Sequence, residues 1–151
     1  MNVTMINKIK YSDKELLNLV DYISQYSKCL SRKVGAVIVN KKKDDIISFA
    51  YNKVPSNTSD CTVCPRHNCK SGECLHICKA LHAEELAILK ALKSKKSLND
   101  CILYVSCTPC YHCSKLIAQV GIRTVITKLD YDDGYNKKLQ NEAHIKVTIN
   151  E

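Results

Sequence analysis

Two short segments carry side chains that could do chemistry together. Residues 82–84 place a histidine and a glutamate two positions apart, just before an apolar run. Residues 109–113 hold a proline and then two cysteines three positions apart. Imidazole nitrogens and thiolate sulfurs are preferred ligands of zinc. If both segments begin helices that point at one place, His82, Cys110 and Cys113 supply three zinc ligands and leave a fourth position to water, as in catalytic zinc sites.

The spacing within each segment favours this arrangement. Pro109 suits the first position of a helix, which predicts that Cys110 and Cys113 lie in its first turn with both sulfurs on one face. The positive end of a helix lowers the pKa of a thiol there. Glu84 lies on a different helical bearing from His82, so its carboxylate could exchange protons with the water without binding the metal. The neighbouring Glu85 is interpreted as a solvated acid that favours the helix dipole.

Hydrophobic periodicity predicts the elements that must position these residues. Expected helices cover 13–30, 82–93 and 110–120, with a short one within 132–142, and expected strands cover 34–40, 46–52, 101–107, 123–129 and 144–149. Ser12 and Glu15 fit a capping box, and Gly121 suits the end of the third helix. Strands that alternate with helices after an initial hairpin predict a mixed sheet with helices on both faces.

Residues 53–81 show no periodicity and contain five of the ten cysteines of the chain. Irregular stretches of this length are uncommon in a compact domain unless they are functional or stapled. Reducing compartments disfavour structural disulfides, so the cysteines are interpreted as metal ligands or catalytic groups. Zinc could be the staple.

The composition indicates one globular domain over residues 1–151, with the cysteine- and histidine-rich segment as an insert. No apolar stretch approaches the ~18 residues of a membrane span, and the first residues do not resemble a signal peptide, so we expect a cytoplasmic protein without a membrane partner. The formal charge of +8 favours anionic partners, either nucleic acid or phosphorylated small molecules. A solvated lysine-rich surface is the simpler explanation of that charge.

Together, H-x-E and P-C-x-x-C form the signature of zinc deaminases. Beyond it, "HAEELAI" (82–88), "PCYHCSKLIAQVGI" (109–122) and residues 22–39 resemble the deoxycytidylate (dCMP) deaminases of the cytidine deaminase-like superfamily. The resemblance covers about residues 12–131. It implies a three-layer α/β/α sandwich around a central five-stranded mixed sheet. It also implies zinc-dependent hydrolysis of dCMP to dUMP and ammonia, which supplies the precursor for dTMP synthesis.

The resemblance implies roles for individual residues. Zinc is expected at His82, Cys110 and Cys113, with Glu84 as the proton shuttle. Substrate contacts are expected at Asn52, Tyr131 and Arg32, with Lys33 close by, and a plain surface role is the alternative for these outer positions.

Some relatives also hold a second, structural zinc, which implies a closed four-ligand site that would stabilise the insert. The candidate ligands are Cys29, Cys61, His76 and Cys78, with Cys64 as the nearest substitute. Cys69 and Cys74 could bind the metal instead, or be free thiols.

Three positions depart from the family pattern. Leu86 replaces an asparagine, and Ala50 and Lys53 replace two glycines beside Asn52. Lysine does not adopt positive φ cheaply, so this loop is expected to differ in shape. In regulated relatives the loop belongs to the site for the effectors dCTP and dTTP. Relatives also assemble into hexamers or other oligomers, so we expect a homo-oligomer.

Two alternatives follow from the same residues. The first keeps the chemistry and changes the substrate to a tRNA adenosine or a cytosine in single-stranded nucleic acid. The chain has no tryptophan and no basic, aromatic stacking tract, which disfavours such polymers. The second is a non-catalytic zinc-binding module for nucleic acid or a protein partner, and it leaves Glu84 beside a three-ligand site unexplained.

Overall fold

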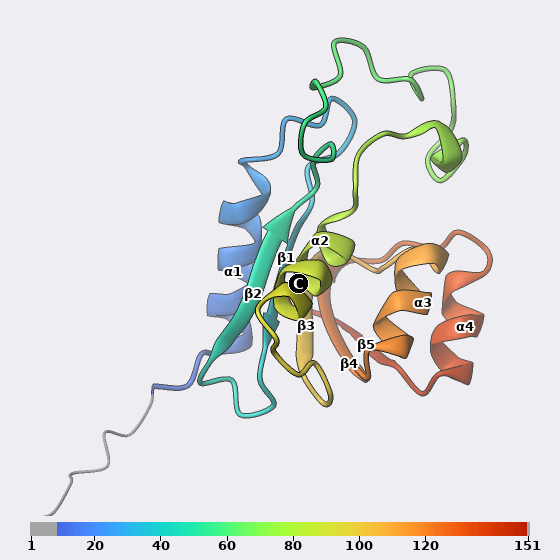
Figure 1. Ribbon diagram of the computed structural model, residues 1–151. Helices are drawn as coiled ribbons and strands as arrows, with labels where there is room; N and C mark the ends of the chain where they lie inside the picture. The colour runs from blue at the N-terminus through green and yellow to red at the C-terminus, as the bar shows by residue number, and fades with distance from the viewer. Residues whose placement is uncertain (1–8, 151) are drawn as a thin grey trace, which may run out of the picture.

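The computed structural model describes residues 9–150, and these form alternating helices and strands in the expected order (Figure 1). The helices are α1 (Asp13–Ser24), α2 (Ala83–Lys93), α3 (Tyr111–Gln119) and α4 (Asn136–Glu142), with a short 3-10 helix η1 (Leu75–Ile77). The strands are β1 (Gly35–Val39), β2 (Ile46–Tyr51), β3 (Ile102–Cys107), β4 (Thr124–Leu129) and β5 (Lys146–Ile149). No helix in this range is both long and apolar enough to cross a membrane.

The strands form one sheet in the order β2-β1-β3-β4-β5. β1 runs antiparallel to β2 and β3, whereas β3, β4 and β5 are mutually parallel. The predicted mixed five-stranded sheet is therefore confirmed. Because Gly35 pairs with Tyr51 and Ala36 with Val105, the start of β1 lies at the same end of the sheet as the ends of β2 and β3.

Side chains of the central strands alternate between two apolar layers, as the pleat requires. On one face, Val37 and Tyr104 pack against α1. On the other face, Ile38 and Leu103 pack against α2 and α3. Both faces of β1 are fully buried, which explains its continuous apolar sequence. The expected three-layer α/β/α sandwich is confirmed, with α4 lying beside α3 in Figure 1.

Most predicted boundaries agree with the structure, but the expected extension of the first helix to residue 30 was wrong. α1 begins with the predicted capping box of Ser12 and Glu15 and ends at Ser24. Beyond it, the buried Ser27 donates from Oγ to the carbonyl oxygen of Asn52 over 2.8 Å. This bond ties the chain after α1 to the end of β2. At the other boundary of interest, Gly121 (φ +86°) follows the end of α3, as predicted.

The insert lies beyond the end of β2, at the top of Figure 1. Its base is closed by two hydrogen bonds between the backbones of Lys53 and Leu81, of 3.2 and 2.8 Å. Inside it, a disulfide joins Cys69 to Cys74. The sequence analysis predicted that Cys69 and Cys74 bind metal or remain free thiols. This prediction was wrong, because the two residues form a disulfide.

Gly35 allows α1 to lie very close to β1. A β-carbon at this position would come 2.3 Å from the backbone oxygen of Val20, and backbone atoms cannot yield as a flexible side chain can. We therefore expect Gly35→Ala to lower the free energy of unfolding by about 1–3 kcal/mol through overpacking. Urea denaturation measures this loss. Asn18→Ala, an exposed change on α1, should stay within about 0.5 kcal/mol of wild type. An unchanged urea midpoint for Gly35→Ala would mean that α1 lies farther from β1.

Candidate active site and metal centre

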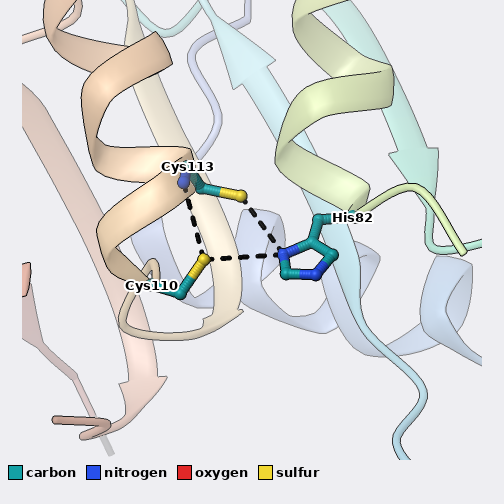
Figure 2. Close-up of side chains that lie close together, drawn as sticks. All are labelled: His82, Cys110 and Cys113. Carbon is teal, nitrogen blue, oxygen red and sulfur yellow. Dashed lines mark hydrogen bonds between the residues drawn. The ribbon is translucent and has the colours of Figure 1, made fainter. Parts of the chain in front are cut away.

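Two helix starts meet at the end of the sheet that carries the carboxyl terminus of β3 (Figure 2). His82 is the N-cap residue of α2, and Cys110 is the N-cap residue of α3. Cys113 follows in the first turn of α3, and its backbone N–H donates to the Cys110 sulfur over 3.5 Å. Cys110 therefore precedes the first turn, and the prediction that it lies within that turn was wrong. Its extended backbone (φ −67°, ψ 170°) is typical of an N-cap, so Pro109 lies before the cap and not at the first helical position.

The three predicted ligands converge. His82 Nδ1 lies 3.3 Å from Cys113 Sγ and 3.6 Å from Cys110 Sγ. Zinc bonds of about 2.3 Å to sulfur and 2.0–2.1 Å to nitrogen place tetrahedral ligands about 3.6 Å apart, so the donor set and its spacing fit zinc. Within residues 9–150, this is the one group of three or more His, Cys, Asp or Glu side chains whose ligand atoms all lie within 4.8 Å.

The charges of the three side chains are coupled. A hydrogen bond from the Cys113 thiol lowers the pKa of Cys110 to about 4, so Cys110 is a thiolate at neutral pH. The same bond, together with burial, raises the pKa of Cys113. A hydrogen bond with Cys110 raises the pKa of His82 to about 9. A divalent cation needs thiolates and a neutral imidazole, so its binding here releases protons.

Glu84 lies beside this group without joining it. Its carboxyl is in the first turn of α2, and the residue is only 4% exposed. Burial raises the pKa of Glu84 to about 7. A carboxyl group that titrates near neutrality is suited to both accept and donate a proton during a reaction.

A pocket of about 300 Å³ opens onto His82, Glu84 and Cys110. The three predicted substrate-contact residues, Asn52, Tyr131 and Arg32, also line it. Their contacts with substrate stay predictions.

The side chain of Asn52 shapes the loop before β1. Its Oδ1 accepts from the Val34 N–H and its Nδ2 donates to the Arg32 carbonyl, each over 2.8 Å. Arg32 in turn lies with its guanidinium carbon 5.9 Å from the ring centroid of Tyr131. Asn52 therefore fixes the backbone that carries Arg32.

The candidate ligands of a second metal are not part of the His82, Cys110 and Cys113 group, although Cys29, Cys64 and Cys78 line the pocket that opens onto it. Cys29, Cys61, Cys64 and Cys78 are free thiols that line a neighbouring pocket of about 230 Å³. His76 is not among the residues that line it. The four sulfurs do not form a group as tight as the first centre, so this second site stays a prediction.

Glu85 has a larger role than a solvated acid. Its Oε2 accepts from the backbone N–H of His82 over 2.7 Å, as the partner in a capping box. Its Oε1 lies 2.8 Å from Nε2 of His112 on α3. Glu85 therefore holds His82 and links the two helix starts. The spacing of His82 and Glu85 matches a capping box, but histidine is an unusual cap, and no sequence pattern indicated the His112 contact.

Comparison with known proteins extends this picture. Residues 10–129 match the family model for the cytidine and deoxycytidylate deaminase zinc-binding region. The chain is 33% identical to a deoxycytidylate deaminase of Schizosaccharomyces pombe over 140 residues, covering 89% of this chain and 42% of that protein. It is 34% identical to a deoxycytidylate deaminase of Mycobacterium phage D29, covering 76% of this chain and 91% of the phage protein.

A solved structure is also similar. The dCMP deaminase of cyanophage S-TIM5, crystallised with dCMP and dUMP, superposes with a TM-score of 0.75 at 28% identity, covering 90% of this chain and 94% of that one. The chain spans only about two fifths of the length of the Schizosaccharomyces pombe relative. The match over residues 10–129, the shared fold and the His/Cys/Cys group agree, and the chain belongs to the cytidine and deoxycytidylate deaminase zinc-binding family.

Proposed function

We propose that this chain is a zinc-dependent hydrolase that converts dCMP and water into dUMP and ammonia. The observation that carries the proposal is the convergence of His82, Cys110 and Cys113 beside the buried carboxyl group of Glu84, at a pocket lined by His82, Glu84 and Cys110. The names of the relatives, and the nucleotides bound in the cyanophage structure, support deoxycytidylate (dCMP) as the substrate.

In this proposal His82, Cys110 and Cys113 hold the zinc ion. When bound, zinc supplies Lewis-acid activation of the hydrolytic water. Glu84 takes a proton from the water that attacks carbon 4 of the cytosine ring, and returns it to ring nitrogen 3. Glu84 then takes the second proton of the water and gives it to the departing amine, which leaves as ammonia. The metal ligands and the Glu84 carboxyl group are already in place before substrate binds, so little reorganisation of the protein is needed during the reaction.

The proposal assigns the pocket wall to substrate binding. Asn52, Tyr131 and Arg32 are proposed to contact the nucleotide, with Asn52 also holding the loop of Arg32 in place. The ring of Tyr131, half-buried at the pocket, offers a face against which a base can stack.

We also propose a second, structural zinc held by Cys29, Cys61 and Cys78. Cys64 lines the same pocket as these three and is the fourth ligand that their placement favours, with His76 as the alternative. Zinc would draw the four thiols together and fasten the insert to the loop after α1.

The proposal extends to the setting in which the enzyme works, on the basis of the family resemblance. It is a cytoplasmic homo-oligomer of the kind seen as hexamers among relatives, and dCTP and dTTP are its candidate effectors. The outer face of α2 leaves Leu89 and Leu92 about half exposed, which is consistent with a partner subunit there.

Glu84→Gln should lower ammonia release from dCMP by about 10²- to 10⁴-fold, because an amide cannot exchange the proton. Zinc content should be unchanged, because Glu84 is not a ligand. The measurement is ammonia release by the zinc-loaded full chain, with dCTP, cytidine and RNA tested beside dCMP. Glu142→Gln, an exposed carboxylate on α4, is the control and should act as wild type. Near wild-type turnover by Glu84→Gln would exclude the proton-shuttle role.

Glu85→Ala should weaken zinc binding at the catalytic centre by about 10-fold, because the carboxylate that orients His82 is lost. Glu85→Gln keeps an acceptor for the His82 N–H and should bind zinc nearly as tightly as wild type. Competition with a chromophoric chelator measures both affinities. Equal zinc affinity for Glu85→Ala and wild type would show that His82 is held by other contacts.

The second site predicts two zinc ions per chain, measured by mass spectrometry of metals in protein purified under reducing conditions. Cys29→Ser/Cys78→Ser should retain one zinc, at the catalytic centre. Cys101→Ser, at a buried free thiol away from the insert, should retain two. A single zinc in the wild-type chain would contradict the second site and leave the first intact.

A further inference from the structure

The pocket above the metal centre is strongly cationic on its walls. Three basic side chains line it, from Arg32, Arg66 and Lys70. Glu84, at the metal centre, is the one acidic side chain among the lining residues. Such a distribution attracts an anionic ligand and orients its negative end away from the carboxylate.

The first of these cations lies toward the metal centre. Arg32 lines the pocket together with Cys107, Glu84 and Cys110. Arg32 lies beside Tyr131 as well. Its guanidinium is thus engaged at the inner wall, near the reacting groups.

Arg66 and Lys70 come from the insert and have their charged ends available. Arg66 Nε donates to the Glu73 carbonyl over 2.7 Å, and its two Nη groups have no hydrogen-bond partner within residues 9–150. Lys70 binds Glu73 Oε2 through its backbone N–H over 3.1 Å, and its ammonium group makes no hydrogen bond or ion pair in the same range. The planar fork of an arginine suits two oxygens of one phosphate, and a lysine adds a point charge.

The loop that carries both cations is braced against the pocket. The Cys69–Cys74 disulfide closes residues 69–74 into a loop that contains Lys70, and Arg66, which precedes this loop, is bound to its Glu73 carbonyl oxygen. Gly72, at φ +83°, lies so near Tyr131 that a β-carbon would come 2.7 Å from the tyrosine hydroxyl oxygen. The insert is therefore held beside a residue that also lines the inner pocket, and the two cations have a defined position relative to the metal centre.

We propose that Arg66 and Lys70 bind the 5′-phosphate of the substrate, so that the insert makes the enzyme select nucleoside monophosphates over nucleosides. This inference rests on the proposed function, because it takes the base to lie at the metal centre. The phosphate then lies at the insert, at the other end of the same pocket. Neither residue belongs to the H-x-E or P-C-x-x-C motif, and the pocket lining is what brings them to the site.

Isothermal titration of the zinc-loaded full chain with dUMP and with deoxyuridine tests the inference without relying on turnover. Wild type should bind dUMP more tightly than deoxyuridine. Lys70→Ala should lower dUMP affinity about 10-fold, and Arg66→Ala/Lys70→Ala about 100-fold, as expected for lost charge-assisted hydrogen bonds. Deoxyuridine affinity should not change. The Lys70 ammonium makes no hydrogen bond or ion pair within the described residues, so Lys70→Ala remains informative if the double variant folds poorly.

Lys41→Ala/Lys42→Ala is the matched control, because it removes the same net charge from two exposed positions outside the pocket lining. It should keep the wild-type preference for dUMP. A preference for dUMP that survives in Arg66→Ala/Lys70→Ala, or an equal loss in the control, would overturn the inference. If wild type does not release ammonia from dCMP yet binds dUMP through Arg66 and Lys70, the proposed function fails and the phosphate site stands. If wild type deaminates dCMP but the variants keep the dUMP preference, the proposed function stands and the phosphate site at Arg66 and Lys70 fails.

Discussion

The account depends on the meeting of two helix starts that are distant in the sequence. His82 and Cys110 are 28 residues apart, yet each is the residue that caps its helix, and their side chains touch. A strand between the two helices makes this meeting possible, because β3 lies inside the sheet and returns the chain to the same end. Both helices also pack on the same face of the sheet. The site is therefore a product of the topology as much as of the three donors.

The meeting brings together charges that would be costly without a counter-ion. Two thiols, a carboxyl group and an imidazole lie in a partly or fully buried cluster, and the thiol and carboxyl pKa values are shifted as a result. Separating ionised groups from water costs several kcal/mol each unless they are paired. A dication satisfies two thiolates at once, which gives a physical reason for the match between this cluster and zinc. Glu85 and Asn52 hold the backbone around it, so the geometry does not rely on the metal alone.

The sequence predicted the fold and the metal centre well because their signals are local. Alternating apolar runs located every strand within two residues, and the H-x-E and C-x-x-C spacings identified the donors that converge. The errors came from contacts between distant segments. Hydrophobic periodicity predicted that the first helix continues beyond Ser24, because no local sequence signal shows that Ser27 binds the carbonyl oxygen of Asn52. The link from Glu85 to His112 was missed for the same reason.

The insert shows this limit most clearly. Its lack of periodicity was visible in the sequence, but cysteine spacing does not determine which thiols pair, and the Cys69–Cys74 disulfide was not foreseen. Nor did the basic residues inside it stand out among 23 lysines and arginines. A role for Arg66 and Lys70 becomes evident only in the folded structure, where both residues line the pocket.

The most direct test of the central claim is a crystal structure of the zinc-loaded chain with data collected at the zinc absorption edge. The account predicts an anomalous peak about 2.3 Å from the sulfurs of Cys110 and Cys113 and about 2.0–2.1 Å from His82 Nδ1, with no fourth protein ligand. A zinc ion bound by only one or two of these residues, or closed off by a fourth side chain, would contradict a hydrolytic centre here.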